Sequence, residues 1–85
     1  MPFITYILQS QKSGRLYIGQ CSDLAARLHR HNAGSVLSTR QGRPWYLIFS
    51  EYYDTRAKAV RRERYLKSLK SPKYILQHIV RKAGP

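Results

Sequence analysis

The sequence predicts a small α/β chain of the α+β kind, in which a three-stranded, mainly antiparallel sheet is flanked by three helices. Three observations predict this class. Eighty-five residues, 42% of them hydrophobic, suffice for one modest core. Runs of strand and helix type follow in the order strand, strand, helix, strand, helix, helix. Capping residues and glycines separate these runs without a repeat or linker, so residues 1–85 are expected to form one domain.

The predicted sheet begins with a hairpin. Residues 3–9 are apolar or β-branched on both alternating faces, which is typical of a strand covered on both sides. Residues 10–15 are polar and form the turn, and residues 16–19 return to strand character. Residues 45–50 form the third strand, whose place in the sheet the pattern leaves open.

The first helix is predicted over residues 23–32, with Ser22 as its N-cap and Gly34 just beyond its end. Helical spacing defines the stripe that faces the sheet. Half of this stripe is polar, although it must pack against a core. Its members are Leu24, Arg27, Leu28 and His31.

Two more helices follow the third strand. Asp54 or Thr55 caps the first of them, which runs to about residue 70. Ser71 and Pro72 then supply an N-cap and a proline in the first turn, which opens the last helix.

The chain is strongly basic. Its 16 Lys and Arg residues against 4 acids give a formal net charge of +12. Self-repulsion of that size favours a polyanionic partner, and nucleic acid is the first candidate. A basic surface without a specific partner, or one that meets an anionic membrane, is the alternative. Residues 33–44 are expected to form a long basic loop that contacts a substrate.

The compartment is read from cysteine use and hydropathy. Cys21 is the only cysteine, so no internal disulfide can form. No apolar N-terminal run resembles a signal peptide or a membrane span. A cytoplasmic protein that does not enter a membrane is therefore expected.

One of the four acids has no simple structural reason. Asp23 and Asp54 stand at helix starts, where an anion is favourable, and Glu51 ends a strand. Glu63 instead lies on the inward stripe of its helix. It shares that stripe with Ala59, Val60 and Leu66. A partly buried carboxylate needs a partner or a function.

Five polar residues could converge at one edge of the sheet: Tyr6, Tyr17, Arg27, His31 and Glu63. Since isolated buried charges are costly, a shared site is an economical explanation. The alternative is a plain Arg27–Glu63 ion pair, with His31 and the tyrosines as ordinary core residues.

As chemistry, the set suits phosphodiester cleavage with one divalent metal ion. Glu63 would hold Mg²⁺ or Mn²⁺, which keep most of their waters and need few protein ligands. Arg27 would neutralise charge on the phosphate. A tyrosine or His31 would take the proton of the attacking water, and the residues alone leave this base open. The sequence has no Gly-rich phosphate loop, zinc-type Cys/His cluster or Ser/His/Asp set.

Six ordered blocks carry a family resemblance. They are Tyr6-Ile7-Leu8, Leu16-Tyr17-Ile18-Gly19-Gln20, Asp23-Leu24-Ala25-Ala26-Arg27-Leu28, His31-Asn32-Ala33-Gly34, Gly42-Arg43-Pro44-Trp45 and Ala59-Val60-Arg61-Arg62-Glu63. In this order they resemble the GIY-YIG nuclease domain and, more narrowly, its small stand-alone bacterial members. The likeness runs over about residues 3–80.

The resemblance implies a role for each of the five residues. Tyr6 belongs to the first half-motif, and Tyr17 to the second, where it is the expected general base. Arg27 corresponds to the catalytic arginine and Glu63 to the metal-binding glutamate. His31 occupies a position where relatives carry histidine or tyrosine near the attacking water.

Two positions depart from the family pattern. The first half-motif reads Ile4-Thr5-Tyr6, without the usual glycine. Gln20 stands where some relatives have a lysine after the second half-motif, which removes one positive charge.

The leading hypothesis is a metal-dependent endonuclease or nickase that hydrolyses DNA, with branched DNA, flapped DNA and RNA compatible with the same basic surface. The rival hypotheses are a nucleic-acid-binding module without catalysis and an accessory to a partner nuclease. The nucleic acid is expected to contact Gln20, Arg40, Arg43, Arg61, Arg62, Arg64, Lys67 and Lys70.

Overall fold

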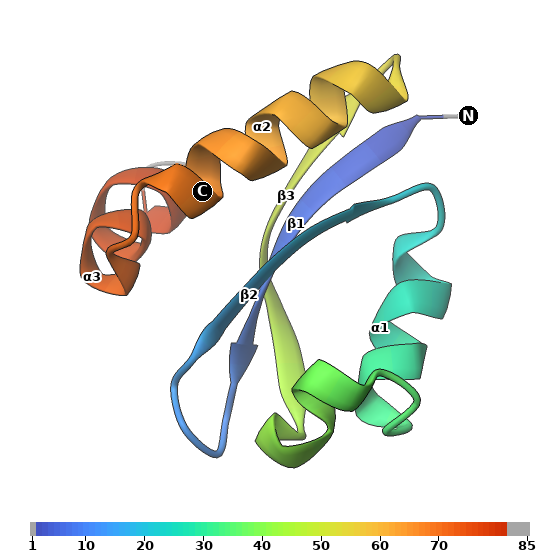
Figure 1. The fold of residues 1–85 in the computed structure, drawn as a ribbon, viewed down its shortest axis with the longest axis vertical. Coiled ribbons are helices and arrows are strands. Elements are labelled where there is room, and N and C mark those ends of the chain that lie inside the picture. The colour runs from blue at the N-terminus through green and yellow to red at the C-terminus, as the bar shows by residue number, and fades with distance from the viewer. Residues whose placement is uncertain (1, 82–85) are drawn as a thin grey trace.

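The computed structural model describes residues 2–81 and contains one three-stranded sheet (Figure 1). Its strands are β1 (Phe3–Ser10), β2 (Leu16–Cys21) and β3 (Trp45–Tyr53), in the order β2-β1-β3. Both neighbouring pairs are antiparallel, which confirms the predicted fold class. The structure also places β3 beside β1 and extends it past the predicted end at residue 50. The strands β2 and β3 are therefore the two edges.

Helices cover both faces of this sheet. Helices α1 (Leu24–Asn32) and α2 (Arg56–Ser68) lie on opposite sides of it, as Figure 1 shows. The short helix α3 (Pro72–Ile75) continues into a π-helical turn, η2 (Leu76–Val80), on the same side as α2. Among residues 2–81, none of the helices has both the length and the apolar character that crossing a membrane requires.

Side chains cap the helices largely as predicted. Thr55 accepts a hydrogen bond from the backbone of α2, and Ser71 does so for α3. The cap of α1 is Asp23, not the predicted Ser22, because the Asp23 carboxylate accepts the bond from the Ala26 N–H at 3.0 Å.

The segment predicted to be a long loop, residues 33–44, contains a 3₁₀ helix, η1 (Leu37–Gly42). The prediction of an irregular loop was wrong here. A high content of Gly, Ser and Arg indicates that the chain turns, but it does not distinguish isolated turns from the consecutive turns of a 3₁₀ helix. Gly34 ends α1 with a positive φ of 82°, as predicted. The segment is thereby folded back over the end of α1.

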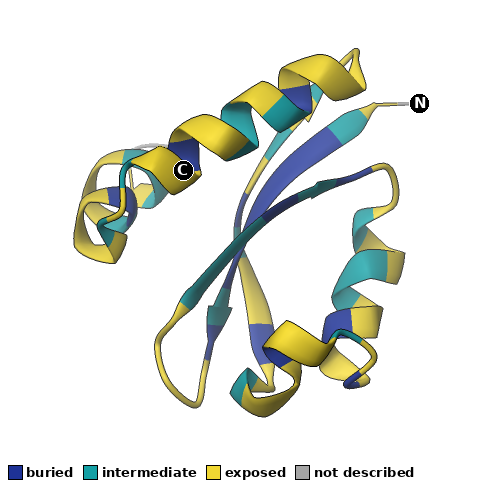
Figure 2. Ribbon diagram, in the orientation of Figure 1, coloured by how far each residue is buried: buried dark blue, intermediate teal, exposed yellow. Residues whose placement is uncertain are grey.

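The central strand β1 buries both of its faces, in agreement with its double apolar pattern (Figure 2). One face carries Tyr6 and packs against α1, and we call it the α1 face. The other face carries Ile7 and packs against α2 and α3, and we call it the α2 face. The Thr5 hydroxyl belongs to the α2 face, where it donates to the Ala59 carbonyl at 2.8 Å. Side chains on the two faces can therefore meet only around an edge of the sheet.

Candidate active site

Tyr6 and Gly19 form a matched pair across β1 and β2. They are directly opposite in the antiparallel register, and the Tyr6 side chain is fully buried. A Cβ atom on Gly19 would lie 2.6 Å from the Tyr6 hydroxyl oxygen and 3.2 Å from Cε1 of Tyr17. Glycine is therefore required at position 19 because the Tyr6 phenol passes over the backbone of β2 at that point.

A buried chain of hydrogen bonds holds the Tyr6 hydroxyl. It lies 3.3 Å from Nε2 of His31, whose Nδ1 is 2.8 Å from the Thr39 hydroxyl. The Thr39 hydroxyl in turn donates to the Val36 carbonyl at 3.3 Å, so it accepts the proton of Nδ1. Nε2 is then the acceptor, and Tyr6 is the donor to it.

The protonation states of Tyr6 and His31 follow from the burial of their side chains. Burial lowers the pKa of His31, and the nearby charges of Arg27 and Arg30 lower it further. Burial, followed by the neighbouring Tyr17, raises the pKa of Tyr6 well above its ordinary value, although Arg27 opposes this shift. Both side chains are therefore neutral near pH 7. Tyr6 can position a ligand, but it is poorly suited to accept a proton.

Tyr17 differs from Tyr6 in exposure and in partners. It lies on the edge strand β2 and is only half-buried. Its ring packs edge-on against His31, with 4.7 Å between the ring centroids, and near Tyr6, with 6.4 Å. Its hydroxyl forms no hydrogen bond with any of residues 2–81. The Tyr17 hydroxyl is thus available to a ligand or a water molecule.

Arg27 brings a positive charge to the same face. It is half-buried on α1. After the larger effect of burial, the positive charge of its guanidinium lowers the pKa of His31 further and partly offsets the raised pKa of Tyr6 and of Cys21. In the part of the chain that the structure describes, no carboxylate pairs with it. The predicted alternative, an Arg27–Glu63 ion pair, is therefore not what the structure contains. A guanidinium without a carboxylate partner, beside the neutral Tyr6 phenol, is suited to binding an anion.

Glu63 lies on the other side of the sheet, on α2. Its side chain is 18% exposed, and its Oε2 pairs with Nζ of Lys67 at 2.6 Å. Helical spacing places Glu63 on the same side of α2 as Lys67 and Arg56, both of which reach β2. The carboxylate therefore lies on the side of α2 that faces the outer edge of β2, whereas the ring of Tyr17 packs on the α1 face. The two faces share that edge.

The donor set limits which metal ion could bind. No three His, Cys, Asp or Glu side chains of the described residues cluster closely enough to hold a metal together. The other acids are occupied, since Asp23 caps α1, Asp54 pairs with Lys58 and Glu51 pairs with Arg62. A single carboxylate oxygen fits a hard, largely hydrated ion such as Mg²⁺ or Mn²⁺ and does not fit a tetrahedral zinc site.

Comparison with known proteins decides the family. The model of the GIY-YIG catalytic domain matches residues 2–75. The chain belongs to the GIY-YIG family. Several Staphylococcus aureus UPF0213 proteins are 38% identical to it over 56 residues, which is 65% of this chain and 68% of theirs. The solution NMR structure of a UPF0213 protein from Bacillus halodurans superposes with a TM-score of 0.60 at 29% identity, covering 100% of this chain and 89% of that one. The names of these relatives state no activity.

Within this GIY-YIG domain, the predicted nucleic-acid contacts separate into groups. Lys67 and Lys70 lie at the outer edge of β2. Arg61 and Arg64 are exposed on the outer side of α2. Arg62 turns toward β3 instead, where its Nε bonds Glu51 at 2.9 Å. Arg62 is therefore held away from β2.

The remaining predicted contacts lie elsewhere. Arg40 and Arg43 are exposed at η1, and their Nε atoms donate to the carbonyls of Gly34 and Arg40. The side chain of Gln20 accepts a bond from Arg56 at 3.0 Å. Arg56 thus places a positive charge beside Gln20.

Two polar side chains with defined partners in the structure, Thr39 and Arg56, were not predicted from the sequence. A signal existed for Arg56, because a cation in the first turn of α2 is unfavourable for the helix dipole and so calls for a partner. For Thr39 the sequence offers no signal, since its bond to His31 depends on how η1 folds over α1.

Proposed function

We propose that this GIY-YIG domain is an endonuclease or nickase that hydrolyses phosphodiester bonds of DNA with one divalent metal ion. The family supports nuclease chemistry in general. The observation that carries the finer proposal is the contrast between the two tyrosines. The Tyr6 hydroxyl donates to His31, whereas the hydroxyl of the half-buried Tyr17, on the edge strand β2, makes no hydrogen bond with the described residues, 2–81.

Each side chain has a distinct part in the proposed reaction. In its phenolate form, Tyr17 takes a proton from the water whose oxygen bonds to phosphorus. The phosphorus–oxygen bond to the leaving strand breaks in the same displacement, and the leaving oxygen takes a proton from solvent. Arg27 stabilises the negative charge that develops on the phosphate oxygens. Tyr6, whose proton is donated to neutral His31, accepts a hydrogen bond from the attacking water through its phenol oxygen and so orients that water. His31 is a weak candidate for the base because it is fully buried and both ring nitrogens have partners.

Glu63 would hold the metal ion, and its ion pair with Lys67 would have to open for that. When bound, Mg²⁺ or Mn²⁺ supplies Lewis-acid neutralisation of the phosphate and lowers the pKa of a coordinated water.

Cleavage of a labelled panel of single-stranded, duplex, branched and flapped DNA, with an RNA strand included, tests this proposal. In Mg²⁺ or Mn²⁺, Tyr17→Phe should lower the rate by about 10²–10⁴-fold, which is the usual contribution of a general base. Tyr52→Phe is the matched control, because Tyr52 is 65% exposed on β3 and far from the edge of β2. A folded Glu63→Ala protein that cuts as fast as the wild type would overturn the metal mechanism.

One observation favours a second function, that of a nucleic-acid-binding module without catalysis. Lys67 already neutralises Glu63 at 2.6 Å, so the carboxylate has a structural role without any metal. The same panel separates the two functions. Binding that weakens steeply with salt, together with uncut substrate after long incubation in either metal, would support the binding module.

A further inference from the structure

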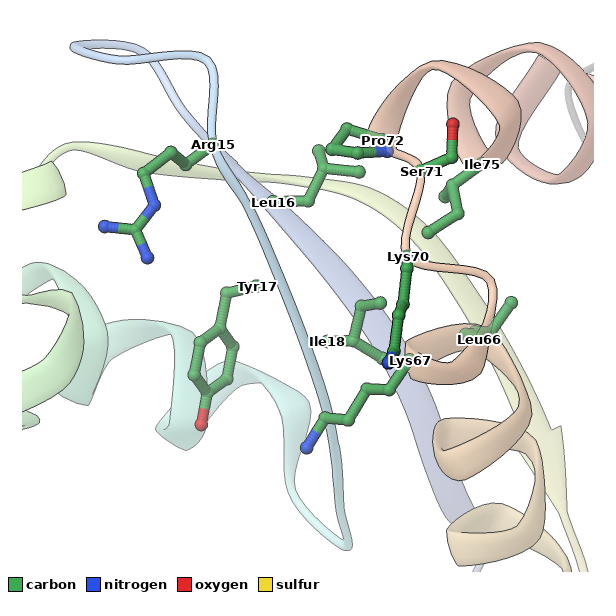
Figure 3. Close-up of a pocket in the computed structure, with 10 residues that line it drawn as sticks. All are labelled: Arg15, Leu16, Tyr17, Ile18, Leu66, Lys67, Lys70, Ser71, Pro72 and Ile75. Carbon is green, nitrogen blue, oxygen red and sulfur yellow. The ribbon is translucent and has the colours of Figure 1, made fainter.

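An open groove runs along the outer edge of β2, between that strand and the helices α2 and α3 (Figure 3). Its volume is about 430 Å³, within the range of about 300–1,000 Å³ that is usual for small-ligand sites. Figure 3 shows Leu16 and Ile18 extending from β2 toward the helices, while the ring of Tyr17 extends to the opposite side. The floor is aliphatic. It is formed by Leu16, Ile18, Leu66, Pro72 and Ile75.

The polar rim of this groove is formed by Lys67 and Lys70. Lys67 is paired with Glu63 at 2.6 Å, and the Arg15 side chain extends to the same side of β2 as the Tyr17 ring (Figure 3), so Lys70 is the rim cation among the lining residues that has no carboxylate partner within residues 2–81. Such a combination suits a ligand with a flat apolar part and an anionic group beside it. A nucleobase with its neighbouring phosphates has this chemistry.

Lys70 is a second, independent sign that the rim binds a ligand. Its φ is +53°, a left-handed conformation that side chains rarely adopt, at the end of α2 where glycine is the usual residue. Glycine would remove the strain. Backbone strain of this kind concentrates where a side chain is needed for binding.

The groove and the candidate active site lie on opposite sides of β2 and adjoin at Tyr17. Tyr17 is one of the residues that line the groove, while its ring packs near Tyr6 and His31 on the α1 face. A nucleic acid whose phosphate lies beside Tyr17 would therefore present an adjacent nucleotide to the groove. An acidic apolar peptide has similar chemistry, but the net charge of +12 and membership of a nuclease family favour nucleic acid.

We infer that this groove is a subsite for one unstacked nucleobase next to the scissile phosphate, with Lys70 on a flanking phosphate. The inference rests on the proposed function and names its substrate more narrowly. The nucleotide beside the cut must be unpaired or extruded, because a base that is paired and stacked within a duplex is not free to enter the groove.

An NMR titration in EDTA tests the subsite without any cleavage. The probes are 2′-deoxyadenosine 5′-monophosphate and 2-deoxyribose 5-phosphate, which differ only in the base. The nucleotide should shift the backbone amides of Leu16, Ile18 and Lys70, and the sugar phosphate should shift Lys70 alone. Equal shifts with both probes, or none at the two strand residues, would overturn the inference. Tighter binding of a Glu/Leu-rich peptide at the same amides would also overturn it.

A variant pair extends the test to oligonucleotides, again in EDTA. Lys70→Gly removes the charge and the strained φ, so it should melt no lower than the wild type. We expect its affinity for a single-stranded oligonucleotide to fall about fivefold more than that of Lys73→Ala, which removes the same charge from an exposed position outside the groove. An abasic oligonucleotide should abolish that difference. Equal losses in both variants would contradict the subsite.

The two proposals fail separately. A protein that prefers the nucleotide over the sugar phosphate but never cleaves in Mg²⁺ would remove the nuclease mechanism and keep the subsite. Cleavage that depends on Tyr17, together with equal binding of the nucleotide and the sugar phosphate, would keep the nuclease mechanism and remove the nucleobase subsite.

Discussion

The two faces of the sheet are built from different chemistry. On the α1 face, Tyr6, His31 and Thr39 are buried yet joined by hydrogen bonds, so their geometry is directional. On the α2 face, the buried cluster of Ile7, Phe49, Leu66 and Ile75 is apolar, and its packing is not directional. Both faces bury apolar side chains, among them Ile4, Leu8 and Trp45 on the α1 face, so both contribute to stability. The α1 face in addition sets the orientation of the polar side chains Tyr6 and His31.

The largest expected effect comes from opening a cavity on the α2 face. Phe49→Ala should lower the free energy of unfolding by about 3–5 kcal/mol, because Phe49 is 5% exposed and its contacts would be lost. Denaturant unfolding measures this loss, and Phe49→Leu should lose clearly less. If the faces are independent, the imidazole ¹⁵N shifts of His31 stay as in the wild type. Altered shifts in the folded variant would show that the two faces are coupled.

A smaller effect is expected from cutting the hydrogen-bond chain on the α1 face. Thr39→Val keeps the shape but removes the acceptor of the Nδ1 proton, which should cost about 1–3 kcal/mol. The His31 tautomer should also become mixed, and Tyr6 should lose its fixed orientation. Nitrogen-15 NMR of the imidazole reads this directly. Thr39→Ser, which retains the hydroxyl, should keep the single His31 tautomer and the wild-type cleavage rate. If Thr39 acts through packing alone, the His31 tautomer of Thr39→Val will be the same as in the wild type.

The smallest effect is a pH dependence that belongs to the α1 face alone. Because burial, then Arg27 and Arg30, lower the pKa of His31 in the folded protein, the unfolded chain binds the proton first as the pH falls. The stability that neutral His31 contributes is complete above its ordinary pKa of about 6.5 and decreases as the pH falls toward the lowered folded value. Thermal melting between pH 7.5 and 5.5 should show this decline. It should persist in His29→Gln and vanish in His31→Phe, and an unchanged slope in His31→Phe would assign it to another group.

Much of this arrangement could be predicted from local pattern. Helical spacing correctly placed Arg27 and His31 on the inward side of α1, and it placed Glu63 on the inward side of α2. Errors occurred where one hydrogen bond decides between neighbours, as with Ser22 and Asp23 at the cap of α1. Another occurred in residues 33–44, where composition indicated turns but not the 3₁₀ helix.

The sequence by itself determined which elements form, which side of each helix faces inward and how positive the surface is, because these depend on residues near one another in the chain. Only the tertiary structure decided that α1 and α2 pack on opposite faces, that Thr39 reaches His31 and that Glu63 lies on the other side of the sheet from Tyr6 and His31. Periodicity defines direction relative to a helix axis, whereas contacts between distant segments are chosen by the packing of the whole core.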